Sequence, residues 1–386
     1  MKTKVLLGLS GGVDSAVAAY ILKEQGYDVT CAFMRNWDAF ANNDIMGNPT
    51  IQNDVCPQEQ DYLDAKAVAD KLELPLLRVD FVKEYWDDVF TYFLEEYRKG
   101  RTPNPDILCN KYIKFNAFMK YGKSLGFDYV ATGHYAQVDH TQEYSRMLRG
   151  ADNNKDQTYF LCQVPQDALS HSIFPIGNLQ KSEVREIASK LELDSVSTKK
   201  DSTGICFIGE RNFKQFLQNY LPSKDGDIVD IVSLEKVGRH IGVLYYTIGQ
   251  RKGLGIGGNK GPWFVVGKDV QKNILYVTNG SENDWLYSTS CIVSGVNWLR
   301  PTKPEQDYDC TAKFRYRQMD HGVTLRFIDE TTVLLTYPQG VKSVTCGQEA
   351  VFYDHEECLG GGVIEEVFCN GISMQKKIED HVAHGN

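Results

Sequence analysis

A single turn near the start of the chain restricts the fold more than any other stretch. An apolar run, "KVLLGL", leads into "SGGVDS", and a helix-like stretch then follows up to Gly26. Glycines let the backbone approach an anion, and the first N–H groups of the helix point at the same place, so this layout predicts a phosphate cradle. An ordinary strand–helix turn is the alternative interpretation of two glycines alone. Because no lysine follows the glycines, the stretch is not the GxxxxGK[ST] loop.

Apolar runs alternate with helix-like stretches through the first third of the chain. Strands are expected at residues 4–9, 28–34, 74–80 and 128–133, and helices at residues 15–25, 61–72, 84–99, 113–125 and 181–191. This alternation predicts an α/β fold with a doubly wound parallel sheet. Residues 36–60 have no period and are expected to form a long loop near the ligand-binding edge of that sheet.

The character of the chain changes after about residue 220, where glycine and β-branched residues replace the helical pattern. From residue 288 onward, short strands recur about every ten residues, which is typical of a closed β-barrel or a sandwich. We therefore predict three domains: an α/β catalytic domain at 1–215, a small β-rich central domain at 216–285 and a C-terminal β-barrel at 286–386. The polar tail, residues 376–386, is expected to be disordered.

Charge and apolar patterning limit the partners of this chain. A formal net charge of −9 argues against non-specific coating of nucleic acid, although a local basic face remains compatible with it. There is no apolar run of about 18 residues, so no membrane span is expected. The apolar run at the N-terminus is too short for a signal peptide, so a cytoplasmic location is expected. The oligomeric state expected is a monomer.

The ten cysteines of the chain are scattered, and no two of them are spaced as CxxC, which disfavours a zinc knuckle. Most are expected to be reduced and buried. Cys109 differs because it lies in a proline-rich loop near an expected helix start, with Lys111 and Lys114 following, a setting that favours a thiolate. Asp106 lies three residues before it, close enough for proton transfer. Cys206 likewise follows a Ser-Thr-Gly turn among basic residues.

Taken together, these motifs resemble those of the bacterial tRNA-specific 2-thiouridylases, members of the ATP pyrophosphatase superfamily. The resemblance covers nearly the whole chain and rests on "GLSGGVDS", "NWD", "EYWDDVF", "GRTPNPDILCNKYIKF", "ATGHYA", "KDQTYFL", "DSTGICFIGER", "YYTIGQRKGLGIGG" and "AKFRYRQ", in that order. Two departures from the family pattern are a long stretch at residues 39–60 and Tyr112 in place of an acidic residue.

The resemblance implies a binding site for ATP with Mg²⁺ and for tRNA. The residues that would line the nucleotide are Gly8, Leu9, Ser10, Gly11, Gly12, Val13, Asp14, Ser15, Met34 and Gly133. The chemistry of Asp14 by itself suggests a helix cap or a metal contact. The residues that would contact tRNA are Asn104, Pro105, Asp106, His134, Lys155, Asp156, Gln157, Arg315, Tyr316 and Gln348.

The same resemblance implies a division of labour between the two cysteines. Cys206 would carry persulfide sulfur, Cys109 would be the nucleophile that assists its release, and Asp106 would serve as acid or base. The acceptor would be the wobble uridine of the tRNAs for Lys, Glu and Gln, and AMP would be the leaving group. The sulfur donor would be a cysteine desulfurase or a sulfur-relay carrier protein.

"AKFRYRQ" (residues 312–318) alternates cations with aromatic residues. On a strand, this alternation would place Lys313, Arg315 and Arg317 on one side, as phosphate contacts, and the rings on the other. A solvated outer face over core aromatics is the equally simple interpretation.

Three alternatives stay open. The chain could be another adenylating ligase of the ATP pyrophosphatase superfamily, although no glutaminase-like domain is present. It could be an RNA-binding module with a vestigial nucleotide site. Finally, Asp106, Cys109 and Cys206 could hold an iron–sulfur cluster that delivers sulfide, instead of cycling through a persulfide and a disulfide.

Overall fold

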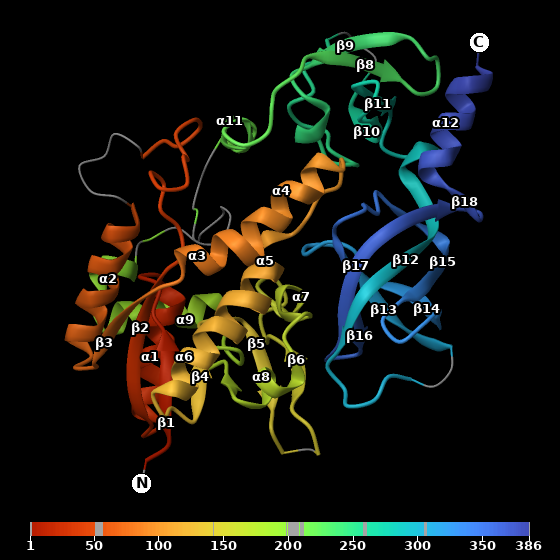
Figure 1. The fold of residues 1–386 in the computed structure, drawn as a ribbon. Helices are drawn as coiled ribbons and strands as arrows, with labels where there is room; N and C mark the ends of the chain where they lie inside the picture. The colour runs from red at the N-terminus through yellow and green to blue at the C-terminus, as the bar shows by residue number, and fades with distance from the viewer. Residues whose placement is uncertain are drawn as a thin grey trace.

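The structure is a computed structural model, which describes residues 2–50, 57–141, 143–197, 199, 208, 212–257, 261–304 and 307–385. Its strands form three sheets, and Figure 1 shows helix α4 (Thr91–Arg98) running from the first domain toward the second sheet. The expected α/β domain, β-rich central part and C-terminal barrel are all present. In the part of the chain that is described, no helix has the length and apolar character needed to cross a membrane.

The first sheet is parallel throughout and has the strand order β3-β2-β1-β4-β7. Its strands are β1 (Lys4–Gly8), β2 (Asp28–Arg35), β3 (Leu76–Asp80), β4 (Tyr129–Ala131) and β7 (Ser172–Ile173). Along β1, Val5 and Leu7 enter one hydrophobic cluster while Leu6 enters another. Helices therefore cover both faces, which confirms the predicted doubly wound sheet.

The five predicted helices of the first domain are present, with changed bounds. The predicted helix at 84–99 is interrupted by a π-helical segment, and the helical run predicted from residue 113 begins at Pro105. The helices are α1 (Val13–Glu24), α2 (Pro57–Lys71), α3 (Val82–Tyr85), the π-helix η1 (Trp86–Phe90), α4, α5 (Pro105–Leu108), the π-helix η2 (Cys109–Ala117), α6 (Phe118–Ser124), α7 (Thr158–Leu161), α8 (Gln166–Ser170), α9 (Lys181–Lys190), α10 (Asp194–Ser197) and α11 (Phe213–Gln218). The short helices α7, α8, α10 and α11 were not predicted. Helix α2 begins at Pro57, within the stretch predicted as a loop.

The second sheet has four strands in the order β10-β11-β8-β9 and forms the small middle domain. The strands are β8 (Gly226–Asp230), β9 (Lys236–His240), β10 (Trp263–Asp269) and β11 (Ile274–Asn279), accompanied by the short 3-10 helices η3 (Val243–Tyr245) and η4 (Asp284–Leu286). Helix α4 of the first domain contacts η3, so the middle domain lies next to the end of that helix.

The third sheet closes into a barrel because β12 pairs with both β15 and β17. A hairpin of the first domain extends it, since Leu148 lies opposite Glu357. The strands are β5 (Ala136–Asp139), β6 (Arg146–Arg149), β12 (Tyr287–Trp298), β13 (Tyr308–Lys313), β14 (His321–Phe327), β15 (Val333–Lys342), β16 (Glu349–Asp354), β17 (Glu357–Cys369) and β18 (Ile372–Ser373).

Two local predictions for the C-terminal part were wrong. Strand β13 ends at Lys313, and residues 314–318 form a turn, so "AKFRYRQ" does not present cations and rings on opposite faces of a strand. The tail is not disordered but forms helix α12 (Met374–His384). Ile378 on this helix is only 3% exposed because it packs in the hydrophobic cluster of the middle domain.

Candidate active site at the edge of the parallel sheet

Two glycines shape the cradle at the carboxyl ends of β1 and β4. Gly11 has a left-handed φ of +75°, and a Cβ atom there would lie 2.2 Å from the carbonyl oxygen of Asp61. A Cβ atom on Gly133 would lie 2.8 Å from the backbone nitrogen of Ser15. A side chain at Gly11 would therefore clash with the backbone of α2, and one at Gly133 would clash with the start of α1.

Hydroxyl groups hold the turn in a defined shape. The Ser15 Oγ atom accepts a hydrogen bond from the Ser10 backbone at 3.1 Å and donates one to the Gly12 carbonyl at 3.1 Å. Helix α1 begins at Val13 with Gly12 as its N-cap, and no side chain caps it. The first N–H groups of this helix remain available for an anion, as the sequence led us to expect.

Asp14 does not cap α1, and among the residues that the structure describes it belongs to no cluster of metal-binding side chains. Its carboxylate accepts hydrogen bonds from the Tyr135 hydroxyl at 2.8 Å and from Lys181 Nζ at 2.7 Å. Lys181 is the first residue of α9, and its side chain is 12% exposed. Lys181 begins a predicted helix, but no sequence motif marks it as part of the site. Asp14 therefore holds Lys181 beside the phosphate cradle. The cradle's own sequence lacks the lysine of the GxxxxGK[ST] loop.

A second lysine approaches the same turn from elsewhere in the chain. Lys199 Nζ donates hydrogen bonds to the Gly11 carbonyl at 3.0 Å and to the Asp61 carboxylate at 2.9 Å, and it also pairs with Asp64. The carboxylates raise the pKa of Lys199 even though partial burial lowers it. The ammonium group is thus charged at neutral pH and fixed beneath the glycine turn.

The remaining predicted nucleotide residues lie at the same edge of the sheet. Met34 is near the end of β2, and its Cε atom lies 3.0 Å from the position of a Cβ atom on Gly8. The structure therefore brings together the whole predicted set, from Gly8 to Ser15 with Met34 and Gly133. Their contact with ATP stays a prediction.

The loop that carries Asp106 and Cys109 is organised by its own residues. Asn104 is the N-cap of α5, and its side-chain oxygen accepts from the Asp106 nitrogen at 3.1 Å and from the Ile107 nitrogen at 3.4 Å. Pro105 occupies the first helical position, which suits its fixed φ. Cys109 follows as the first residue of the π-helix η2 and is fully buried. Irregular π-turns of this kind are frequent at functional sites.

Cys206, the predicted carrier of sulfur, lies outside the described residues. Its position relative to Cys109 and Asp106 therefore stays a prediction, and so does the alternative iron–sulfur cluster. Within the ranges that the structure describes, no group of three or more His, Cys, Asp or Glu side chains could hold a metal ion.

His134 connects the cradle to the helix that begins at Cys109. The residue follows Gly133, is buried, and has its Nδ1 atom 2.7 Å from the Thr132 hydroxyl. Its Nε2 atom lies 3.3 Å from Nζ of Lys114, which is part of η2. Burial and the neighbouring ammonium group lower the pKa of His134 well below its ordinary value. The imidazole is therefore neutral at neutral pH and joins the two halves of the site.

Among the residues predicted to contact tRNA, Lys155 and Tyr316 lie side by side. The Tyr316 hydroxyl donates to the Lys155 carbonyl at 3.5 Å, and its ring lies 4.4 Å from the ring of Phe160. The side-chain oxygen of Gln157 accepts a hydrogen bond from the Tyr135 backbone nitrogen at 2.9 Å.

Asp156 is buried, and its carboxylate accepts from the Gly150 nitrogen at 3.1 Å and the Thr158 hydroxyl at 2.9 Å. Its side chain thus supports the loop from within.

Arg315 and Gln348 are both used inside the protein. The Arg315 guanidinium donates to the carbonyls of Ile248 at 2.6 Å and Ser343 at 2.9 Å, so it joins the middle domain to the barrel. These acceptors draw the side chain inward and explain why the chain turns after Lys313. Gln348 donates to the Thr102 carbonyl at 2.7 Å. Contact of either residue with tRNA stays a prediction.

Three family models match the chain in succession. They describe a tRNA methyl transferase HUP domain (residues 3–210), a tRNA methyl transferase PRC-barrel domain (214–279) and an aminomethyltransferase beta-barrel domain (288–364). The tRNA-specific 2-thiouridylase MnmA of Mycoplasma capricolum is 56% identical over 375 residues, which cover 95% of this chain and 100% of the relative. The chain belongs to the tRNA-specific 2-thiouridylase family.

Other members of the tRNA-specific 2-thiouridylase family are similarly close. The MnmA protein of Bacillus cytotoxicus is 54% identical over 370 residues, or 96% of each chain. Among solved structures, the NMN synthetase from Francisella tularensis is 19% identical and aligns over 52% of this chain and 67% of its own, with a TM-score of 0.33. The membership predicted from the motifs is thus confirmed through full-length relatives.

Proposed function

We propose that this chain thiolates C2 of the wobble uridine in the tRNAs for Lys, Glu and Gln, with ATP as the activating substrate. One observation carries the proposal: the phosphate cradle at the sheet edge is joined through His134 and Lys114 to the helix that begins at Cys109. A nucleotide in the cradle and a base beside Asp106 would then lie within one continuous site. The names of the full-length relatives give the reaction class.

The first proposed step is adenylation. The C2 oxygen of the uridine attacks the α-phosphorus of ATP, and pyrophosphate leaves. The N–H groups of α1 and the two lysines at the turn, Lys181 and Lys199, would balance the negative charge that develops on the phosphates. Mg²⁺ is proposed to accompany the phosphates. A carbonyl oxygen is a poor leaving group, and adenylation converts it into part of AMP.

The second proposed step is sulfur transfer. The terminal sulfur of a persulfide on Cys206 attacks C2, and AMP leaves with the former carbonyl oxygen. The Cys109 thiolate then attacks the sulfur of Cys206, which releases 2-thiouridine and leaves a Cys109–Cys206 disulfide. An external thiol reduces this disulfide. Asp106 is proposed to act as the acid or base that donates or accepts a proton during sulfur transfer. A cysteine desulfurase or a relay carrier protein is proposed to reload Cys206.

Two other activities fit the residues less well. The family descriptions mention methyl transfer, but a glycine turn with two lysines is suited to a chain of phosphates, and methyl transfer has no use for the proposed sulfur relay between Cys206 and Cys109. A ligase of the same superfamily would use the cradle but not the cysteines. Pyrophosphate release that depends on unmodified tRNA separates the thiolation from such a ligase.

The test is thiolation of unmodified tRNA with ATP, Mg²⁺ and a cysteine desulfurase that receives cysteine. Wild type, Cys109→Ser and Cys206→Ser are compared, with Cys369→Ser in the barrel as the matched control. Nucleoside mass spectrometry should show 2-thiouridine with wild type and the control, and a loss of at least about 100-fold with the other two variants, because a serine cannot carry or release sulfur. All four proteins should bind tRNA.

Thiolation at the wild-type rate by Cys206→Ser would rule out the persulfide role. Iron in protein purified without oxygen, together with visible absorption that Cys109→Ser removes, would instead favour a cluster on Asp106, Cys109 and Cys206.

A further inference from the structure

The three residues before the Asn104 loop, residues 100–102, are held by both smaller domains. They connect the end of α4 to α5, and the latter leads directly to Cys109. Since only one residue separates Thr102 from the helix cap Asn104, any movement of this segment shifts the loop that carries Asp106. We call residues 100–102 the hinge segment.

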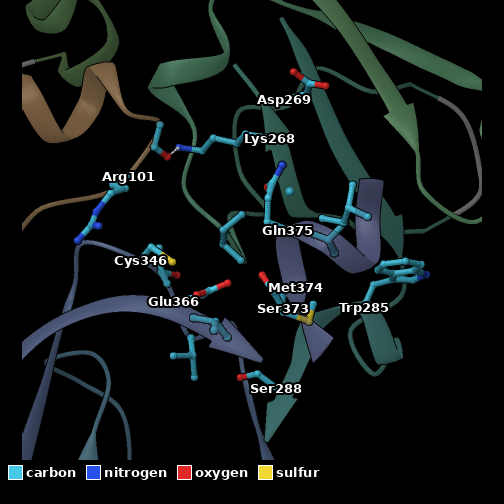
Figure 2. Close-up of a pocket in the computed structure, with 18 of the residues that line it drawn as sticks. Arg101, Lys268, Asp269, Trp285, Ser288, Cys346, Glu366, Ser373, Met374 and Gln375 are labelled. Carbon is cyan, nitrogen blue, oxygen red and sulfur yellow. Dashed lines mark hydrogen bonds between the residues drawn. The ribbon is translucent and has the colours of Figure 1, made fainter. Parts of the chain in front are cut away.

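The middle domain holds the first residue of the hinge segment. Lys268 on β10 donates from Nζ to the Gly100 carbonyl at 2.8 Å, and Lys268 is 8% exposed (Figure 2). Among the residues that the structure describes, Lys268 forms no ion pair, and its ammonium group donates to the Gly100 carbonyl. Gly100 has a φ of +78°, and a Cβ atom there would lie 2.7 Å from Cγ2 of Val270. The backbone at Gly100 therefore lies so close to Val270 that only a glycine fits there.

The C-terminal barrel holds the last residue of the hinge segment. The Thr102 nitrogen donates to the Cys346 carbonyl at 3.0 Å, and Gln348 Nε2 donates to the Thr102 carbonyl at 2.7 Å. A Cβ atom on Gly347 would lie 2.9 Å from the Thr102 nitrogen, so the two backbones touch. Both backbone groups of Thr102 are thus bonded to the barrel.

Arg101 between them bridges domains as well. Its guanidinium pairs with Glu96 at the end of α4 and with Glu365 on β17. The hydroxyl groups of Thr102 and Thr247 lie 3.3 Å apart, which adds a second contact with the middle domain. Every residue of the hinge segment therefore has a polar contact with another domain.

A cavity lies behind the hinge segment, so packing does not fix it from that side. The cavity has a volume of about 650 Å³ and is bordered by Gly100, Arg101 and Lys268, by Cys346 of the barrel and by Met374 and Gln375 of α12. In Figure 2, Lys268 reaches across the top of this space to the backbone next to Arg101, and Cys346 and Glu366 lie below. Within the first domain, the backbone nitrogens of Gly100 and Arg101 donate to the carbonyls of Tyr97 and Glu96, both at 2.9 Å, which fixes the start of the segment to α4. The Gly100 carbonyl and both backbone groups of Thr102 are bonded to the two smaller domains, which therefore set how the segment continues toward Asn104.

We propose that Lys268 and Gln348 are positioning residues, which hold the hinge segment so that Asp106 and Cys109 meet the target base. The inference deepens the proposed thiolation and rests on it for its kinetic readout. It gives Gln348 a role inside the protein in addition to the tRNA contact that the sequence predicted. The middle domain and the barrel thereby set the geometry of the sulfur-transfer step, since neither Lys268 nor Gln348 lies on the catalytic loop.

The test compares Lys268→Met and Gln348→Met with a matched control, Lys272→Met. Lys272 lies four residues after Lys268, on the turn between β10 and β11, and is exposed. Methionine keeps the length of each side chain and removes the donor. With saturating tRNA and ATP, the single-turnover rate of thiolation should fall about tenfold or more in the first two variants. The affinity for tRNA should stay within about twofold, and the control should match wild type.

A second readout does not depend on activity. Hydrogen exchange of full-length protein should be faster at residues 101–110 in Lys268→Met and Gln348→Met, with the barrel strands unchanged. Unchanged exchange and an unchanged rate in both variants would overturn the proposal. If Gln348→Met is slow only at limiting tRNA and reaches the wild-type rate at saturating tRNA, Gln348 only binds tRNA and its positioning role is overturned. If wild type itself fails to thiolate but exchange still rises, the positioning role stands and the proposed function fails.

Discussion

Asp14 shows how one residue can look out of place until its partner is known. A carboxylate beside a phosphate cradle is unfavourable alone, but its two contacts, with Tyr135 and Lys181, explain it. The sequence flagged Asp14 as unusual, yet it gave no means of finding Lys181, which is 167 positions away. Only the packing of α9 next to α1 brings the two together.

Replacement of Lys181 by methionine tests the charge at the cradle. Without the ammonium group, tRNA-dependent pyrophosphate release should fall by about 100-fold, because one fixed charge near a developing phosphate charge is lost. The control is Lys190→Met at the other end of the same helix, where the side chain is 71% exposed and pairs with Glu186. Pyrophosphate formation at the wild-type rate in Lys181→Met would show that Lys181 only supports the fold.

Lys268 makes a prediction about the pH dependence of stability. Burial lowers the pKa of its ammonium group from 10.5 to about 7. Between these two pH values the unfolded chain binds a proton that the folded protein does not, so stability should rise with pH, by up to about 1.4 kcal/mol per pH unit. Below pH 7 both forms are charged, and the penalty of burying that charge is fully present.

Lys268→Met removes this penalty, and its free energy of unfolding relative to wild type should therefore be highest below pH 7 and fall as the pH rises toward 10. Denaturant unfolding at several pH values measures this difference. A difference that is independent of pH would mean that Lys268 is not buried as described. If both predictions for Lys268→Met hold, the substitution lowers activity and raises stability, as is common for residues that serve function.

At the level of elements, helix α12 is the clearest departure from the sequence prediction. Its residues are mostly polar, but Met374, Ile378 and Val382 recur every four residues, and all three pack against a hydrophobic cluster. The predicted tail began at residue 376, so it cut this short helical pattern. The Cδ1 atom of Ile378 would lie 2.3 Å from a Cβ atom on Gly267, so the helix rests directly on β10. His381 also contacts the Ile231 carbonyl, with Nε2 2.8 Å away. The helix thus fastens the barrel to the middle domain.

Ile378→Ala should lower the free energy of unfolding by about 2–5 kcal/mol, because a buried side chain leaves a cavity. Calorimetry should show the loss in the transition that includes the middle domain. Lys376→Ala, on the exposed face of the same helix, should change stability by less than about 0.5 kcal/mol. Equal effects of the two substitutions would mean that α12 does not pack on the middle domain.

The elements that the sequence predicted well share a local signal. Strand β1 is a short apolar run, and α1 begins at a glycine turn and ends before Gly26 at a φ of +84°. The prediction for "AKFRYRQ" was wrong because contacts with distant residues determine its conformation. Arg315 donates hydrogen bonds to the carbonyl groups of Ile248 and Ser343, inside the protein. Contacts between distant parts of the chain override a local alternation of this kind.

At the scale of the whole molecule, the three domains share more structure than the sequence indicated. The β5–β6 hairpin of the first domain extends the barrel sheet, and the hinge segment is bonded to both smaller domains. These pairings link residues more than 100 positions apart. The sequence predicted the domain types and the cradle, but it held no local pattern for contacts between domains.

The most direct test of the central proposal follows the oxygen that leaves C2. Unmodified tRNA with a heavy-oxygen label at C2 of the wobble uridine is thiolated in a single turnover, and the AMP produced is analysed by mass spectrometry. Adenylation of that oxygen predicts that the label appears in the phosphate of AMP, in step with the formation of 2-thiouridine. Thiolated tRNA accompanied by unlabelled AMP would contradict the account, because the oxygen would then have left by another route.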